Sequence, residues 1–110
     1  MSSEATAKKN PAAGIAPAPA PAAPWRVKAV TVLPGYRLAL TFMDGTSGVA
    51  DCSSILNAGN PGVYAPLKEA GYFSQVRLEL GAPTWPNGAD LDPAWLYDNL
   101  NNGKTWPVPF

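Results

Sequence analysis

The stretch YRLALTFMDGTSGVAD, residues 36–51, decides the fold because it encodes two strands and the turn that joins them. Apolar side chains recur at every second position of its first half, at Tyr36, Leu38, Leu40 and Phe42. This alternation is typical of a strand with one buried and one solvated face. The Asp-Gly pair at 44–45 favours a tight hairpin turn, so residues 36–43 and 46–51 are predicted to pair as antiparallel strands.

A third strand is predicted directly before this hairpin. The segment WRVKAVTVL, residues 25–33, is rich in β-branched side chains, which favour strands. Pro34-Gly35 follows as a turn signal, since proline presets φ and glycine accepts a positive φ. Residues 25–51 are therefore predicted to form a three-stranded antiparallel meander.

The middle of the chain alternates between loops and short elements. Asp51 or Ser53 is suited to cap one short helical turn, and a short helix is predicted around 66–70, where proline fits the first turn. Residues 73–80 alternate again and predict a fourth strand, with Val76, Leu78 and Leu80 on one face. Residues 81–86 are expected to add a brief extended piece, placed at an edge by its prolines.

The stretch TWPNGADLDPAWLYD, residues 84–98, is dense in polar and aromatic side chains, yet most of them have a local structural explanation. Asn87-Gly88 predicts a tight turn. Asp92 is a strong helix N-cap because its carboxylate accepts free amide hydrogens of the first turn. Pro93 follows at the first helical position, where its missing N–H costs nothing, so a terminal helix is predicted from residue 93 to about residue 100.

These elements predict one small α+β domain at residues 25–103. Its core is a small antiparallel sheet of four to five strands, with the meander first, one or two short helices and a C-terminal helix. Residues 1–24 are rich in proline and alanine, which predicts a disordered tail. Residues 104–110, KTWPVPF, are expected to be an extended aromatic and proline-rich tail. The sequence leaves open whether this tail docks on its own domain or on a partner.

Composition excludes several kinds of chemistry. The chain has 8 basic and 8 acidic side chains, one cysteine and no histidine. It therefore lacks the usual general base and the commonest metal ligand. Cys52 stands beside Asp51, which disfavours a reactive thiolate, and is interpreted as a buried thiol. No enzymatic activity, cofactor or metal is expected. With no disulfide, no signal peptide pattern and no membrane span, a cytoplasmic location is predicted.

Two other functions remain as alternatives. Asp90 and Asp92, with Asp51, are the residues that a metal-dependent hydrolase would use, but no complete metal-binding motif surrounds them. A second alternative is single-stranded nucleic-acid binding by a basic and aromatic sheet face. That face would carry Arg26, Lys28, Arg37 and Arg77. The zero net charge instead favours an ordinary solvated face.

The folded part resembles a known family. Trp85-Pro86-Asn87-Gly88-Ala89-Asp90-Leu91 with Leu96-Tyr97, together with residues 32–56 and 63–78, is similar to the bacterial domain of unknown function 2442 family. The resemblance covers roughly Trp25 to Tyr97. It implies a compact α+β domain without enzymatic activity. It also implies a gene neighbourhood similar to a toxin–antitoxin pair, with this domain as the antitoxin-like half.

Some relatives carry a helix-turn-helix segment after this domain, whereas seven residues follow Gly103 here, so repression by such a segment is not expected. The sequence therefore favours a non-catalytic protein-interaction domain with a small protein partner and no membrane association. The candidate recognition surface consists of aromatic and acidic residues that local structure does not explain: Trp85, Asp90, Tyr97 and Trp106.

Overall fold

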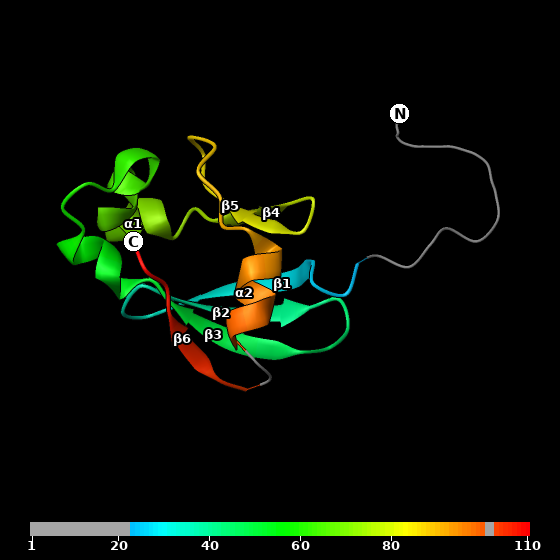
Figure 1. Ribbon diagram of the computed structural model, residues 1–110. Helices are drawn as coiled ribbons and strands as arrows, with labels where there is room; N and C mark the ends of the chain where they lie inside the picture. The colour runs from blue at the N-terminus through cyan, green and yellow to red at the C-terminus, as the bar shows by residue number, and fades with distance from the viewer. Residues whose placement is uncertain (1–22, 101–102) are drawn as a thin grey trace, which may run out of the picture.

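The computed structural model describes residues 23–100 and 103–110, which form a four-stranded sheet, a two-stranded sheet and short helices (Figure 1). The predicted N-terminal tail, residues 1–24, lies outside the described residues except for its last two. In chain order the elements are β1 Val27–Leu33, β2 Arg37–Phe42, β3 Ser47–Asp51, the 3₁₀ helices η2 Ser53–Asn57 and η3 Gly62–Lys68, α1 Ala70–Phe73, β4 Arg77–Glu79, β5 Ala82–Thr84, α2 Pro93–Leu100 and β6 Thr105–Pro107.

The predicted meander is confirmed. β1 pairs antiparallel with β2, and β2 pairs antiparallel with β3. The alternating residues of β2 behave as predicted, because Leu38, Leu40 and Phe42 are buried while Arg37 is exposed. The predicted α+β class and the C-terminal helix are also confirmed.

The prediction of a purely antiparallel sheet is wrong, because β6 adds to the meander as a parallel strand. The sheet order is β1-β2-β3-β6, and Ala50 of β3 aligns with Trp106 of β6. After β3 the chain passes through the helical region, the second sheet and α2 before it returns, so β6 enters the sheet in the direction of β3. The segment 104–110 thus docks on its own domain, and Val108 beyond β6 is fully buried.

β4 and β5 form a separate two-stranded sheet on the β1 side of the molecule (Figure 1). The predicted placement of Leu80 on a shared face with Val76 and Leu78 is wrong. Leu80 stands in the turn between β4 and β5 with a φ of 52°, and 87% of its surface is exposed. The chain reverses immediately after Glu79, so the alternation of the strand ends one residue before Leu80.

The region between the sheets is helical in short pieces. The Asp51 carboxylate accepts a hydrogen bond of 3.0 Å from the Ser53 amide at the start of η2, and this bond lowers the pKa of Asp51. The helix predicted around 66–70 is divided, because Glu69 adopts an extended conformation between η3 and α1.

The helix α2 lies over one face of the four-stranded sheet (Figure 1). As predicted, Asp92 caps this helix: its carboxylate accepts a hydrogen bond of 3.0 Å from the Ala94 amide. Leu96 and Leu100 are fully buried beneath it. They join the core side chains of β2, so one face of α2 is packed against the sheet.

Candidate functional site

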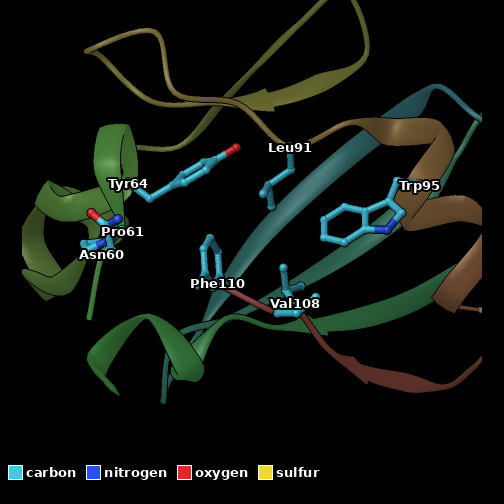
Figure 2. Close-up of a pocket in the computed structure, with 8 residues that line it drawn as sticks. Asn60, Pro61, Tyr64, Leu91, Trp95, Val108 and Phe110 are labelled. Carbon is cyan, nitrogen blue, oxygen red and sulfur yellow. The ribbon is translucent and has the colours of Figure 1, made fainter. Parts of the chain in front are cut away.

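A pocket of about 260 Å³ opens between the helical region, the start of α2 and the end of the chain (Figure 2). Its walls are mostly apolar, and three of its side chains are aromatic. It is lined by Asn60, Pro61, Tyr64, Leu91, Trp95, Val108, Pro109 and Phe110. We refer to this set as the aromatic pocket. Figure 2 shows that Tyr64, Leu91, Trp95 and Phe110 surround one shared space.

The end of the chain forms one wall of the aromatic pocket and is fixed by hydrogen bonds. The Val108 amide donates to the carbonyl of Asp51 over 2.8 Å, which continues the parallel pairing of β6 with β3. The Ser54 hydroxyl donates to the Val108 carbonyl. The Phe110 ring then meets the Tyr64 ring nearly edge to face, with centroids 5.3 Å apart. This wall of the pocket is therefore held in place by contacts within the chain itself.

Tyr64 joins the helical wall to the loop before α2. Its hydroxyl donates a hydrogen bond of 2.7 Å to the main-chain carbonyl of Asp90. Burial, with a smaller contribution from the Asp90 carboxylate, raises the pKa of Tyr64 above its ordinary value of 10.0. The hydroxyl is therefore protonated at neutral pH and acts as a structural donor.

Trp95 forms the opposite wall, in the first turn of α2. Its ring meets Trp106 of β6 edge to face, with centroids 4.8 Å apart. Trp95 lines the pocket and remains 36% exposed, so part of the residue is accessible to solvent. An exposed aromatic beside an apolar pocket is a surface on which a partner gains hydrophobic contact.

The chemistry of this lining favours binding over catalysis. Tyr64 is its one ionisable side chain, and its raised pKa keeps it protonated. Asn60 adds one amide at the rim, while the other lining side chains are apolar. Such a pocket is suited to an aliphatic or aromatic group, with Asn60 available for one polar contact.

Two of the four predicted recognition residues lie beside this pocket. The Asp90 carbonyl holds Tyr64, and the Trp106 ring supports Trp95. Asp90 is exposed and Trp106 is half-buried.

The prediction that Trp85 belongs to the recognition surface is wrong. It is fully buried, and its indole N–H donates a hydrogen bond of 2.9 Å to the Phe73 carbonyl. The neighbouring Asn87 bridges the loop to η3, because its side-chain amide donates to the Val63 carbonyl. Trp85 is buried because the turn at 87–88 directs its side chain inward, where a large aromatic ring adds buried surface to a small core.

Tyr97 is half-buried and lies on α2 away from the pocket lining. Its hydroxyl donates a hydrogen bond to the carboxylate of Asp44, and its ring meets Phe42 edge to face at 5.1 Å. This hydrogen bond is the largest cause that lowers the pKa of Asp44 and raises that of Tyr97. Tyr97 thus attaches α2 to the hairpin between β2 and β3.

Most of the pocket lining was missed by sequence reasoning, including Tyr64, Leu91 and Trp95. The whole lining comes from three segments that are distant in sequence, residues 60–64, 91–95 and 108–110, so no single local pattern marks it. One signal was available: the aromatic side chains of Trp106 and Phe110 at the end of the chain need apolar partners, and Tyr64 is an aromatic residue without a local structural role.

The residues assigned to a metal-dependent hydrolase, and the lone cysteine, have structural roles in the fold. Within residues 23–100 and 103–110, no three Asp, Glu, Cys or His side chains gather as metal ligands. Asp51 and Asp92 each accept a main-chain hydrogen bond at a helix start. The predicted buried state of Cys52 is confirmed, and burial, followed by the charge of Asp51, raises its pKa to about 12.

The predicted basic side chains do not share one sheet face. Arg77 lies in the two-stranded sheet, whereas Lys28 and Arg37 lie in the four-stranded sheet. Arg77 is also paired with Glu79, and the Arg37 guanidinium donates to the Pro34 carbonyl over 2.9 Å. A continuous basic face of the kind predicted is therefore not formed by these residues.

Comparison with known proteins identifies one family. The family described as "Protein of unknown function (DUF2442)" matches residues 27–102, a range that holds β1 to β5 and α2 and ends before β6. No curated protein and no solved structure matches the chain. None of the helices in the described part of the chain has both the length and the apolar character needed to cross a membrane.

Proposed function

We propose that this chain, which belongs to the DUF2442 family of proteins of unknown function, is a non-catalytic protein-interaction domain. Its partner is a small protein encoded beside it, which it neutralises or escorts in the manner of an antitoxin. The aromatic pocket receives an apolar side chain of that partner.

The observation that carries this proposal is the apolar pocket with the partly exposed Trp95 in its lining. Burying one large aliphatic or aromatic side chain contributes about 1.5–3 kcal/mol. Interfaces often concentrate their binding energy at such anchors, where a few buried side chains occupy well-packed pockets. Because hydrogen bonds already fix Val108 and Tyr64, little ordering cost remains when the partner binds.

The size of the pocket supports a side chain rather than a cofactor as its occupant. Its volume of about 260 Å³ is below the range of about 300–1,000 Å³ that is usual for drug-sized ligands. Its lining also offers few polar groups to orient a cofactor, with Asn60 and Tyr64 as the main ones. An anchor such as Leu, Phe or Met from a protein partner matches this combination of volume and polarity.

The electrostatics of the lining agree with a binding role. General acid–base catalysis needs a group that gains and loses a proton near the working pH. Burial moves the pKa of Tyr64 upward, away from neutrality. The thiol of Cys52 is buried as well, with a pKa near 12, and is unsuited to nucleophilic attack.

Co-purification with the product of the neighbouring gene tests this function. Tagged wild-type chain, Trp95→Ala and Trp25→Ala are each co-expressed with that product and captured under identical conditions. Trp25 is a matched control because it is 37% exposed, close to the 36% of Trp95, and does not line the pocket. Wild type and Trp25→Ala should retain the product, and Trp95→Ala should lose most of it. Equal retention by all three, or retention by none, would refute the proposal.

A further inference from the structure

The four-stranded sheet has two edges, β1 and β6, and these differ in their capacity to accept another strand. Edge strands present main-chain N–H and C=O groups that can pair with a further strand. β6 has three residues, and Pro107 has no N–H to donate. β1 has seven residues and no proline. β1 is therefore the edge suited to strand addition.

The hydrogen-bond pattern identifies the free groups of β1. The Met43 amide bonds to Arg26, whereas the Phe42 amide bonds to Thr46 on the opposite side. Because main-chain direction alternates along a strand, the odd-numbered residues of β2 face β1. Their partners in β1 include Thr31, so the main-chain groups of Val30 and Val32 point outward. Within the described residues, no hydrogen-bond partner of these outward groups is found.

The two ends of this edge differ: an exposed leucine lies near one end and an apolar groove near the other. Near its N-terminal end the Val27 amide bonds to the carbonyl of Gly81, so the β4–β5 turn stands against the edge with Leu80 exposed. Near its C-terminal end lies an apolar groove of about 320 Å³. It is lined by Val32, Leu33, Pro34, Gly35, Tyr36, Ala70, Phe73 and Ser74. We refer to it as the β1 groove.

We propose that a second copy of this chain pairs with the free edge of β1, antiparallel and related by a twofold axis at Thr31. The two sheets then join into one eight-stranded sheet across the dimer. This inference does not depend on the proposed function, because Thr31 and the β1 groove are separate from the lining of the aromatic pocket.

The register follows from the outward groups. With Thr31 opposite Thr31 of the second copy, Val30 of each chain lies opposite Val32 of the other. Both valines can then exchange their free N–H and C=O groups across the new pair. β-branched side chains facing each other stabilise a sheet, and small Thr pairs fit the closer non-hydrogen-bonded positions. No charged side chain faces a like charge, because Lys28 lies opposite Pro34.

The same register explains the exposed Leu80. The strand pairing ends before Val27, whose outward amide is already bonded to the Gly81 carbonyl, and the Pro34-Gly35 turn of the second copy meets the β4–β5 turn there, beside the lining of the β1 groove. Leu80, which is 87% exposed in the single chain, is thereby brought to an apolar groove of the second copy. A twofold axis makes this contact twice, as expected of a closed, self-complementary interface.

Sedimentation velocity on the full chain tests the proposal, with Thr31→Lys and the control Thr105→Lys. Both threonines are exposed, and Thr105 lies on the opposite edge strand. Wild type and Thr105→Lys should sediment as dimers over an about fiftyfold range of concentration, as expected for a specific self-association. Thr31→Lys places two ammonium groups face to face and should weaken the dimer by at least about tenfold. Circular dichroism checks that each variant is folded.

A charge-complementation experiment separates pairing at Thr31 from indirect effects. Thr31→Lys and Thr31→Asp chains should each dissociate more readily than wild type, and an equimolar mixture should recover a heterodimer. Leu80→Asn should also weaken the dimer, whereas Leu56→Asn, which alters another exposed leucine, should not. A wild-type chain that is monomeric throughout the concentration range overturns the proposal. A dimer that is unaffected by both Thr31→Lys and Leu80→Asn overturns it as well.

Discussion

The rings of Trp95 and Trp106 meet edge to face, with centroids 4.8 Å apart and planes at 86°. This contact joins the first turn of α2 to β6, the strand that precedes the C-terminal wall of the pocket. The aromatic pocket and the parallel end of the sheet are therefore packed as one unit.

Replacing Trp106 should weaken this unit. Trp106→Ala removes a half-buried indole and its aromatic partner contact, and we expect a loss of about 2 kcal/mol in the free energy of unfolding. Urea denaturation followed by circular dichroism measures the change. Trp25→Ala is the control: Trp25 is 37% exposed and contacts Arg26, and we expect less than about 1 kcal/mol. Equal losses would show that the Trp95–Trp106 contact has no special role.

The two neighbouring carboxylates before α2 should differ in their effect on stability. Asp92→Ala removes the N-cap of α2 and should cost about 1 kcal/mol. Asp90→Ala leaves its main-chain carbonyl to Tyr64 intact and should change stability by less than about 0.5 kcal/mol. Thermal denaturation of both variants provides the comparison. A larger cost for Asp90→Ala than for Asp92→Ala would contradict the structural assignment.

The bond between Tyr97 and Asp44 should stabilise the fold within a defined pH window. The hydrogen bond lowers the pKa of Asp44 below its ordinary value of 3.8. Its contribution to stability is therefore present above about pH 3.8 and is lost as the pH falls through the pKa that Asp44 has in the folded chain. The same bond raises the pKa of Tyr97 above its ordinary value of 10.0. Its contribution to stability is therefore lost as the pH rises through the raised pKa of Tyr97.

The stability difference between wild type and Tyr97→Phe should therefore be largest between these limits and shrink toward both extremes. Urea midpoints from about pH 2 to about pH 12, which extend beyond both ordinary pKa values, test the window. A difference that does not change with pH would mean that the two side chains are not hydrogen-bonded in solution.

The thiol of Cys52 should be protected in the folded chain. Burial is the main cause that raises its pKa to about 12, so the reactive thiolate is scarce at neutral pH. Labelling with a thiol-specific disulfide reagent at about pH 8 should be at least about a hundredfold slower in the native chain than in urea. Equal labelling rates would contradict the buried position.

Local patterns in the sequence predicted much of the fold. Three of these patterns act within a few residues and can be predicted without tertiary information: the alternation in β2, the Asp-Gly turn and the Asp92-Pro93 helix start. The parallel pairing of β6 with β3 could not be predicted from the sequence. It joins residues 49–51 to residues 105–107, which are far apart in the sequence, and a strand of three residues is too short to show an alternating pattern.

The candidate site was predicted only in part, because its walls form through contacts between residues that are far apart in the sequence. Asp90 and Trp106 adjoin the pocket, but the walls at Tyr64 and Phe110 come from segments that meet through long-range packing. Trp85 was misplaced because a tryptophan in a turn motif carries the same local signal whether it faces solvent or the core. Burial at that position is decided by the contact with Phe73, from a distant part of the chain.

The affinity of the chain for the product of the neighbouring gene, measured by titration calorimetry, tests the central claim most directly. Phe110→Ala removes a ring that lines the aromatic pocket, and we expect at least about tenfold weaker binding, equivalent to about 1.4 kcal/mol. Thr31→Lys, which alters the β1 edge, should bind as wild type does. If Phe110→Ala is folded and binds as tightly as wild type, the aromatic pocket is not the recognition site.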